Sequence, residues 1–176
     1  MLLLQANTTT LINIGDLRLI APELILTVSA CVALVMEVIL PYRKSKLTAY
    51  FSLVGVALAF ASLVLQWGNQ GEGFYGMVRV DGFALLFKGI FLISAALAIG
   101  ISTRFLDIEG EQHGEYYALI LFATVGMMFI AGGYDLISLY VSLELMALTF
   151  YVLVAFTKRE KRSNDCLLYT SPSPRD

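Results

Sequence analysis

The chain has 176 residues, of which 58% are hydrophobic and 15% are charged, and its mean hydropathy is +0.76. A soluble domain carries about a quarter charged residues, so this composition excludes a disordered segment and an ordinary cytosolic enzyme. The formal net charge of -2, without a long basic cluster, argues against a nucleic-acid partner. Two cysteines and one histidine provide neither a disulfide framework nor a zinc or iron–sulfur ligand set. The composition is that of a membrane protein.

Five apolar segments are long enough to cross a membrane. A helix needs about 20 mainly apolar residues to span the hydrocarbon core, because each residue advances it by only about 1.5 Å. The sequence therefore predicts an all-α polytopic membrane protein whose membrane domain is residues 1–164. Its transmembrane helices are expected at about residues 19–40, 47–67, 82–103, 116–132 and 135–156.

Basic residues gather on one side of these predicted helices. They lie in the loop at 43–46, at Arg104 and in the segment at 158–162, whereas the other side has only Arg18 and Arg79. Positively charged loops stay in the cytoplasm. We therefore expect the N-terminus to lie outside and the 158–162 segment to be cytoplasmic.

Residues 71–76 read Gly-Glu-Gly-Phe-Tyr-Gly, a formal match to the dinucleotide fingerprint G-x-G-x-x-G. That fingerprint works only between a strand and a soluble helix, where the helix N-terminus meets the pyrophosphate. Here a predicted membrane helix precedes it. The pattern indicates a flexible turn, not a nucleotide site.

Glu144 is the most informative residue of the sequence. It lies near the middle of the fifth predicted helix, roughly 12–14 Å deep, where an ionised acid costs about 2.5–3.5 kcal/mol. It must therefore face protein or internal water. Helical spacing places Tyr140 and Tyr151 on the same face, so we predict a proton-transfer carboxylate lined by two hydroxyl groups. The alternative is a neutral carboxyl that only hydrogen-bonds a neighbouring helix.

Other charged residues lie closer to the helix ends. Lys88 lies six residues into the third predicted helix, so it can either reach the membrane surface or pair with an acid inside the bundle. It is a candidate charge partner for Glu144. Glu23 opens the first helix, where the helix dipole favours an acid. Asp81 and Asp135 are predicted N-caps of their helices.

Small residues recur at four-residue spacing in two of the predicted helices. Gly55 and Ala59 form one such pair, and Ala96 and Gly100 form another. This spacing lets membrane helices approach closely. The pattern predicts helix packing and no more.

Three runs of residues together resemble one known family. They are Ala21-Pro22-Glu23-Leu24-Ile25-Leu26, Val80-Asp81-Gly82-Phe83-Ala84 leading to Lys88, and Tyr140-Val141-Ser142-Leu143-Glu144-Leu145. In order and spacing they resemble subunit N of bacterial respiratory complex I, an antiporter-like membrane subunit of NADH–quinone oxidoreductase. The resemblance covers about residues 15–164.

The resemblance implies that the chain is the N-terminal part of a 14-helix antiporter-like fold, present as a truncated fragment. It implies redox-coupled proton translocation, with Glu144 at the position of a glutamate that pairs with a lysine on a later helix. The flavin, the iron–sulfur clusters and the quinone would belong to other subunits, so this chain would hold no cofactor. Its partners would be other complex I membrane subunits, lipid and protons, in the bacterial cell inner membrane.

Residues 165–176 depart from the family pattern. They contain two Ser-Pro pairs, which cannot continue a helix, and we expect this tail to be non-native. Two other functions fit the same helices. One is a subunit of a multisubunit cation/proton antiporter, and the other is a non-transporting membrane scaffold. The sequence leaves open which quinone is used and whether sodium replaces the proton.

Overall fold

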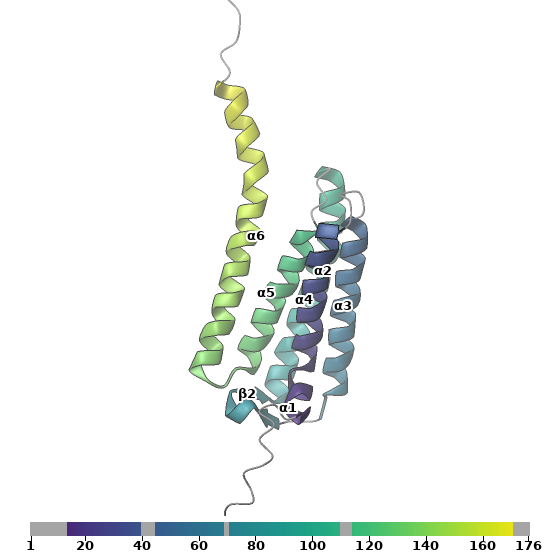
Figure 1. Ribbon diagram of the computed structural model, residues 1–176, viewed down its shortest axis with the longest axis vertical. Helices are drawn as coiled ribbons and strands as arrows, with labels where there is room; N and C mark the ends of the chain where they lie inside the picture. Colours follow the sequence, from purple (N-terminus) through teal and green to yellow (C-terminus); the bar gives the residue numbers. More distant parts are fainter. Residues whose placement is uncertain (1–13, 40–44, 69–70, 110–113, 171–176) are drawn as a thin grey trace, which may run out of the picture.

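The structure is a computed structural model that describes residues 14–39, 45–68, 71–109 and 114–170. Figure 1 shows long helices lying side by side, with a small hairpin near one end of the bundle. In chain order the elements are α1 (Ile14–Leu19), α2 (Ala21–Ile39), α3 (Ser45–Leu65), β1 (Gly71–Gly73), a 3-10 turn (Phe74–Gly76), β2 (Val78–Val80), α4 (Gly82–Glu109), α5 (Glu115–Gly132) and α6 (Leu136–Thr170).

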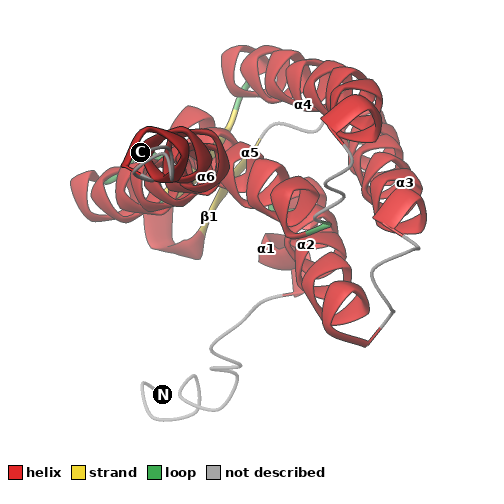
Figure 2. Ribbon diagram, turned by 90° about the horizontal axis from the view of Figure 1, so that it is seen from above, coloured by secondary structure: helices red, strands yellow, loops and turns green. Residues whose placement is uncertain are grey.

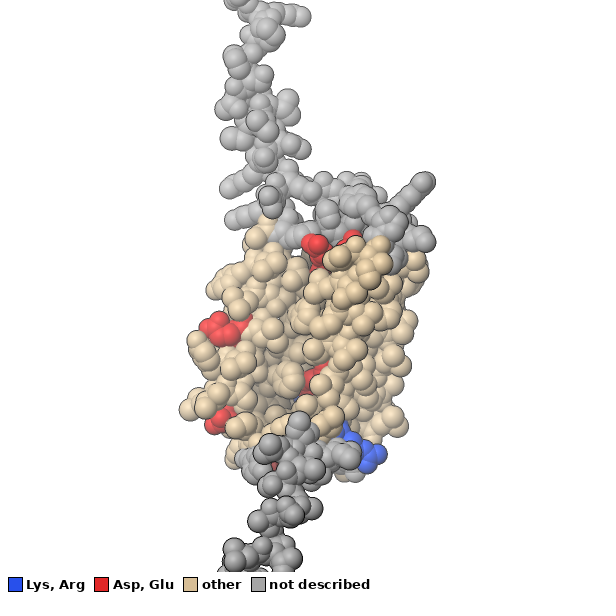
Figure 3. Space-filling view, viewed as in Figure 1, with Lys and Arg blue, Asp and Glu red and all other residues tan. Residues whose placement is uncertain are grey.

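Within the described residues, five helices are long and apolar enough to cross a membrane. The spans are Ala21–Ile39, Leu47–Leu65, Gly82–Thr103, Glu115–Gly132 and Leu136–Ala155. The predicted fold class, an all-α polytopic membrane protein with five spans, is confirmed. Figure 3 shows a wide uncharged surface over these helices, as contact with lipid requires.

Two helices continue beyond their apolar spans. α4 runs to Glu109 and α6 runs to Thr170, directly before the sequence Ser171-Pro172. The segment at 158–162 is polar, but Lys, Arg and Glu are good helix formers. α6 therefore continues beyond the end of its apolar span at Ala155. Residues 171–176, the end of the predicted tail, lie outside the described residues.

The sequence did not predict the break between α1 and α2. Ile20 separates the two helices, and Pro22 follows in the first turn of α2. Proline has no N–H to donate to a carbonyl one turn earlier, so α1 cannot continue unbroken into α2. The first hydrogen bond of α2 runs from the N–H of Leu24 to the carbonyl of Ile20.

The G-x-G-x-x-G segment forms an ordered hairpin. β1 and β2 pair antiparallel, with Gly71 opposite Val80 and Gly73 opposite Val78. Gly76 has a φ of 85°, a left-handed conformation that glycine adopts without strain. The two valines are buried on the helical bundle. The prediction that this segment binds no nucleotide stays a prediction, but the flexible turn is in fact a two-stranded hairpin.

α5 is the central helix of the described bundle. Of its span 56% is buried, compared with 11–39% for the other four. Figure 2 shows α5 between α6 on one side and α2 and α4 on the other. The core around α5 is built from large apolar side chains that are fully buried, among them Leu26, Leu92, Ile99, Leu121 and Met128.

Hydroxyl side chains inside the helices bond to the preceding turn of the same helix. Ser29 donates to the carbonyl of Leu26, Thr124 donates to that of Ile120, and Ser142 donates to that of Ser138. An unpaired hydroxyl in an apolar medium is costly. These bonds let polar residues lie within the membrane spans.

Close helix contacts depend on glycine at two positions. A Cβ added at Gly55 would lie 2.6 Å from both Cβ and Oγ of Ser29, so α2 and α3 touch there. A Cβ at Gly126 would lie 3.0 Å from the backbone nitrogen of Met146, where α5 meets α6. Gly100 has open space around it, so the predicted pair of Ala96 and Gly100 makes no close approach at Gly100.

We predict that Gly55→Ala destabilises the bundle by about 1–3 kcal/mol, the usual range for overpacking. The new methyl group must push α2 away from α3, because it would lie 2.6 Å from Cβ of Ser29, an atom that no side-chain rotation moves. The measurement is the thermal unfolding midpoint of the chain in detergent micelles. Gly100→Ala is the matched control and should leave the midpoint unchanged or higher, since alanine favours helix. Equal midpoints for the two variants would contradict the contact.

Candidate functional site

Lys88 and Glu23 form an ion pair inside the helical bundle. Nζ of Lys88 on α4 lies 2.5 Å from Oε1 of Glu23 on α2, and their side chains are 0% and 1% exposed. Both residues belong to membrane spans. Removing two charges from water costs several kcal/mol per ion, which only a close partner offsets. The burial of each residue therefore depends on the other.

The lysine reaches its partner by passing α5 at a glycine. A Cβ added at Gly132 would lie 3.2 Å from Nζ and 3.4 Å from Cε of Lys88. The side chain of Lys88 thus lies directly against the backbone at the end of α5. Gly132 leaves space for the ammonium group between α4 and α2.

The hydrogen bonding of this pair is incomplete. Among the described residues, neither Oε2 of Glu23 nor Nζ of Lys88 has a hydrogen-bond partner of good geometry. An ammonium group carries three protons, and a carboxylate accepts several hydrogen bonds. Buried polar atoms without partners are rare in proteins and call for an explanation such as bound water.

Glu144 lies on a different part of the molecule. It is half-buried on α6, and the hydroxyl of Tyr140 one turn earlier hydrogen-bonds to it. Tyr140 and Tyr151 are 64% and 71% exposed. The face of α6 that carries Glu144 points away from α5, which packs instead against the side of Ser142 and Met146. Figure 3 shows acidic atoms interrupting the uncharged surface of α6.

The structure brings Lys88 to Glu23, and among the described residues Lys88 forms no ion pair with Glu144. The sequence predicts Glu23 only as an acid favoured by the dipole of its helix and does not predict its pairing with Lys88. The position of each residue along its helix could have indicated the pair. Glu23 and Lys88 each lie within two turns of the N-terminal end of their helix, so they lie at a similar depth in the membrane.

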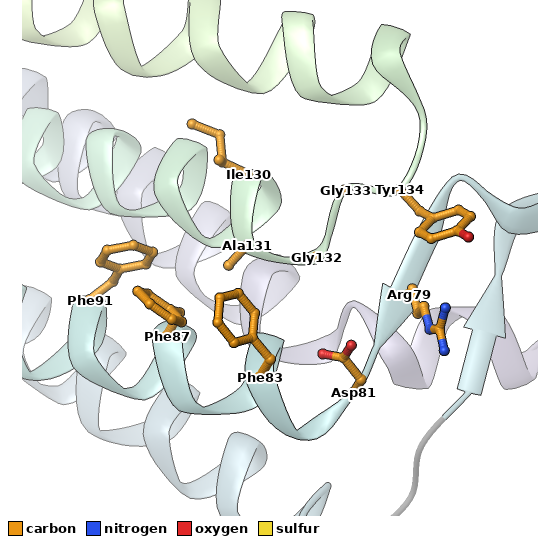
Figure 4. Close-up of a pocket in the computed structure, with 10 residues that line it drawn as sticks. All are labelled: Arg79, Asp81, Phe83, Phe87, Phe91, Ile130, Ala131, Gly132, Gly133 and Tyr134. Atoms are coloured by element: carbon orange, nitrogen blue, oxygen red, sulfur yellow. The ribbon is translucent and has the colours of Figure 1, made fainter.

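A pocket of about 490 Å³ lies between the beginning of α4 and the end of α5. Figure 4 shows Phe83, Phe87 and Phe91 stacked along α4, with Gly132 on the opposite wall. The wall residues are Arg79, Asp81, Phe83, Phe87, Phe91, Ile130, Ala131, Gly132, Gly133 and Tyr134. The pocket is mainly apolar, with three phenylalanines along one wall and charged side chains at one end.

The charged end of this pocket is fixed by local contacts. Asp81 accepts a hydrogen bond of 2.8 Å from the N–H of Ala84, which confirms Asp81 as the predicted N-cap of α4. The guanidinium of Arg79 lies 5.5 Å from the ring centre of Tyr134 and 3.8 Å from Glu72. Asp135 directly precedes α6, and its backbone carbonyl accepts a hydrogen bond from the N–H of Leu139.

Glu37 occupies the opposite end of the bundle. It accepts a hydrogen bond of 3.3 Å from Thr48, and its carboxylate lies against Gly114 at the start of α5. A helix N-terminus favours a negative charge. The neighbouring basic residues Arg43 and Lys44 both lie outside the described residues.

In the part of the chain that the structure describes, no group of three or more His, Cys, Asp or Glu side chains could hold a metal ion.

No protein-family model matches the chain. NADH-quinone oxidoreductase subunit N 1 of Koribacter versatilis is 44% identical over 174 residues, covering 93% of this chain and 34% of the relative. NAD(P)H-quinone oxidoreductase subunit 2 of Synechococcus elongatus is 36% identical over 150 residues, covering 85% of this chain and 29% of the relative. In structure, the chain resembles respiratory complex I from Thermus thermophilus with bound aureothin. That match has a TM-score of 0.65 and 30% identity, and it covers 75% of this chain and 28% of that one.

The apolar spans and the structural match define a multi-pass helical membrane protein similar to a subunit of the complex I membrane arm. Over most of its length the chain is a homologue of subunit N of NADH–quinone oxidoreductase, as the sequence resemblance predicted. Its relatives are subunits of an enzyme complex. The chain spans about one third of the length of the curated relatives it matches.

We predict that Lys88→Met alone destabilises the chain by about 3–5 kcal/mol, because it leaves the carboxylate of Glu23 buried without a partner. Combining Lys88→Met with Glu23→Leu should restore most of the loss, since an apolar pair of similar volume needs no charge partner. Thermal unfolding in detergent micelles measures both variants. A single variant as stable as the unsubstituted chain would contradict the buried pair.

Proposed function

We propose that this chain is a segment of the membrane arm of NADH–quinone oxidoreductase and takes part in redox-coupled proton translocation. Glu144 is the proton-transfer carboxylate. It takes up and releases a proton as its surroundings change, and Tyr140 and Tyr151 line its path. Lys88 is paired with Glu23 inside the bundle and has no part in this step. The complex as a whole is a translocase that couples NADH oxidation by quinone to proton movement.

The observation that carries this proposal is an acid on an uncovered face of an apolar helix. The span Leu136–Ala155 has a mean hydropathy of 1.9, and only 11% of it is buried by the rest of the described bundle. Tyr140, Val141 and Leu148, which share the face of Glu144, are about two-thirds exposed, at 64%, 60% and 59%.

An ionised acid facing lipid is costly, so further protein must cover this face of α6. The relatives are about three times as long as the matched region, so further segments of such a protein would supply that cover. A basic group on such a helix would set the proton affinity of Glu144. Movement of that group would change the affinity, because a nearby cation favours the charged carboxylate.

We propose a cellular setting as well: the bacterial inner membrane, with the N-terminus outside and the 158–162 segment in the cytoplasm. The basic residues on one side of the spans support this orientation. Its partners are lipid and the other membrane subunits of the complex. Flavin, iron–sulfur clusters and quinone bind to other subunits, so this chain moves protons and carries no electrons.

A subunit of a cation/proton antiporter would need the same helices and the same buried acid. The names of the relatives favour the oxidoreductase, since the curated proteins reported above are quinone oxidoreductase subunits. A non-transporting scaffold would use Glu144 only as a hydrogen-bonding group. In an antiporter subunit, NADH oxidation would not drive proton movement. In a scaffold, Glu144 would not need to ionise.

We predict that Glu144→Gln and Glu144→Ala lower proton pumping by the assembled complex about tenfold or more, because neither side chain can exchange a proton. Assembly should survive, since both replacements remove a charge from the membrane. Pumping is measured as acidification of inverted vesicles on addition of NADH. The matched control is Glu72→Gln, which alters an exposed acid in the hairpin. Full pumping by both Glu144 variants would support the scaffold.

The orientation predicts which side of the membrane each helix end reaches. A cysteine introduced at Glu72, beside the outer ends of α3 and α4, should react with a membrane-impermeant thiol reagent in intact cells. A cysteine at Glu115, at the start of α5, should react only in inverted vesicles. Both tests start from a chain in which Cys31 and Cys166 are replaced by serine. The reverse labelling pattern would contradict the assigned orientation.

A further inference from the structure

The ion pair of Glu23 and Lys88 has no part in the role assigned to Glu144. We propose that the pair is a second proton-binding site, occupied by water beside Gly132 and in proton exchange with the adjacent pocket. The ligand is a proton carried by water. The inference rests on the proposed function only in treating the proton as the transported ion.

The case for water begins with the atoms that the protein leaves without partners. Oε2 of Glu23 and Nζ of Lys88 are both buried and lack hydrogen-bond partners among the described residues. One is an acceptor and the other a donor, so a single water molecule can accept from the ammonium group and donate to the carboxylate. Buried water typically makes about three hydrogen bonds to groups of this kind.

Gly132 joins the pair to the pocket. It lies on the pocket wall, and its Cα region also lies against Nζ and Cε of Lys88. Figure 4 shows Gly132 at the end of α5, facing the aromatic stripe of α4 near the charged end of the pocket. Because Gly132 has no side chain, the ammonium group can lie directly against a residue of the pocket wall.

The charged groups around the site come from few elements. Within the described residues, the ionisable partner from α2 is Glu23, and α5 presents backbone at Gly132. β2 and the start of α4 contribute Arg79 and Asp81 at the pocket. Asp81 is held by the first turn of α4, and Arg79 by Tyr134 and Glu72, so both remain at the mouth.

The geometry of the pair suits transfer of a proton. Nζ and Oε1 are 2.5 Å apart, so a proton that leaves the ammonium group has only a short distance to travel to the carboxylate. Transfer breaks one N–H bond and forms one O–H bond, which turns the ion pair into a neutral amine and a neutral acid. A proton arriving through water then binds the amine, and the acid returns its own proton to water, so the pair ends in its starting state.

If the pair served only to hold α2 and α4 together, apolar side chains could replace it. Burial of two charges is often no more stabilising than burial of apolar residues of the same volume. The polar pair costs desolvation, leaves atoms without partners and requires glycine on α5. Proton exchange accounts for the three features together.

The experiment compares three variants in the assembled complex that contains the chain. Glu23→Leu with Lys88→Met removes both charges, Gly132→Ala fills the space beside Nζ, and Gly100→Ala is the control because its surroundings are open. Assembly, NADH-driven vesicle acidification and the pH profile of acidification are measured for each. Infrared difference spectra in H₂O and D₂O, compared with those of Glu23→Gln, test whether the carboxyl of Glu23 exchanges with water.

We expect the double variant to assemble and to acidify vesicles about a hundredfold more slowly, the lower end of the loss typical of a missing proton-transfer group. Gly132→Ala should shift the pH profile and slow the exchange of the Glu23 carboxyl, whereas Gly100→Ala should do neither. An assembled double variant with unchanged rate and pH profile would overturn the proposal. If the double variant does not assemble, the infrared spectra decide, and a Glu23 signal insensitive to D₂O also overturns it.

Failure of this inference is distinguishable from failure of the proposed function. Pumping by Glu144→Gln is recorded in the same preparations. Loss of pumping in that variant alone leaves the proposed function standing and removes the second site. Loss in the double variant alone leaves the second site and removes the role of Glu144.

Discussion

The cost of holding charge in hydrocarbon determines how the five helices are arranged. Lys88 and Glu23 lie in different spans, and each is buried only because the other lies 2.5 Å away. The helix between them is α5, whose last residue, Gly132, lets the lysine pass. The most buried helix of the bundle thus ends beside the ion pair that links α2 to α4.

The same cost applies to Glu144 on α6. Glu144 lies on a span that the described bundle barely covers, whereas the inner pair is fully enclosed. An ionised acid in this position is costly unless further protein covers it. That fits a chain that spans about one third of the length of its relatives.

The sequence predicted the spans because length and apolarity decide whether a helix crosses a membrane. It also predicted the cap at Asp81, since that interaction is local. It did not predict which acid Lys88 would meet, because helix neighbours depend on packing that spacing alone does not encode. The contact at Gly55 and the open space at Gly100 make the same point, since both lie in the same small-residue pattern. The hairpin at 71–80 was missed because its glycine pattern suggested only a turn.

The proposed function requires that the carboxylate of Glu144 is enclosed by protein, away from lipid, in the assembled complex. A nitroxide label attached to a cysteine at position 144 tests this most directly, through its collision rates with lipid-dissolved oxygen and with an aqueous metal complex. The account predicts a low oxygen collision rate in the assembled complex and a higher one in the isolated chain. An oxygen collision rate in the complex as high as that of a freely lipid-facing label would contradict it.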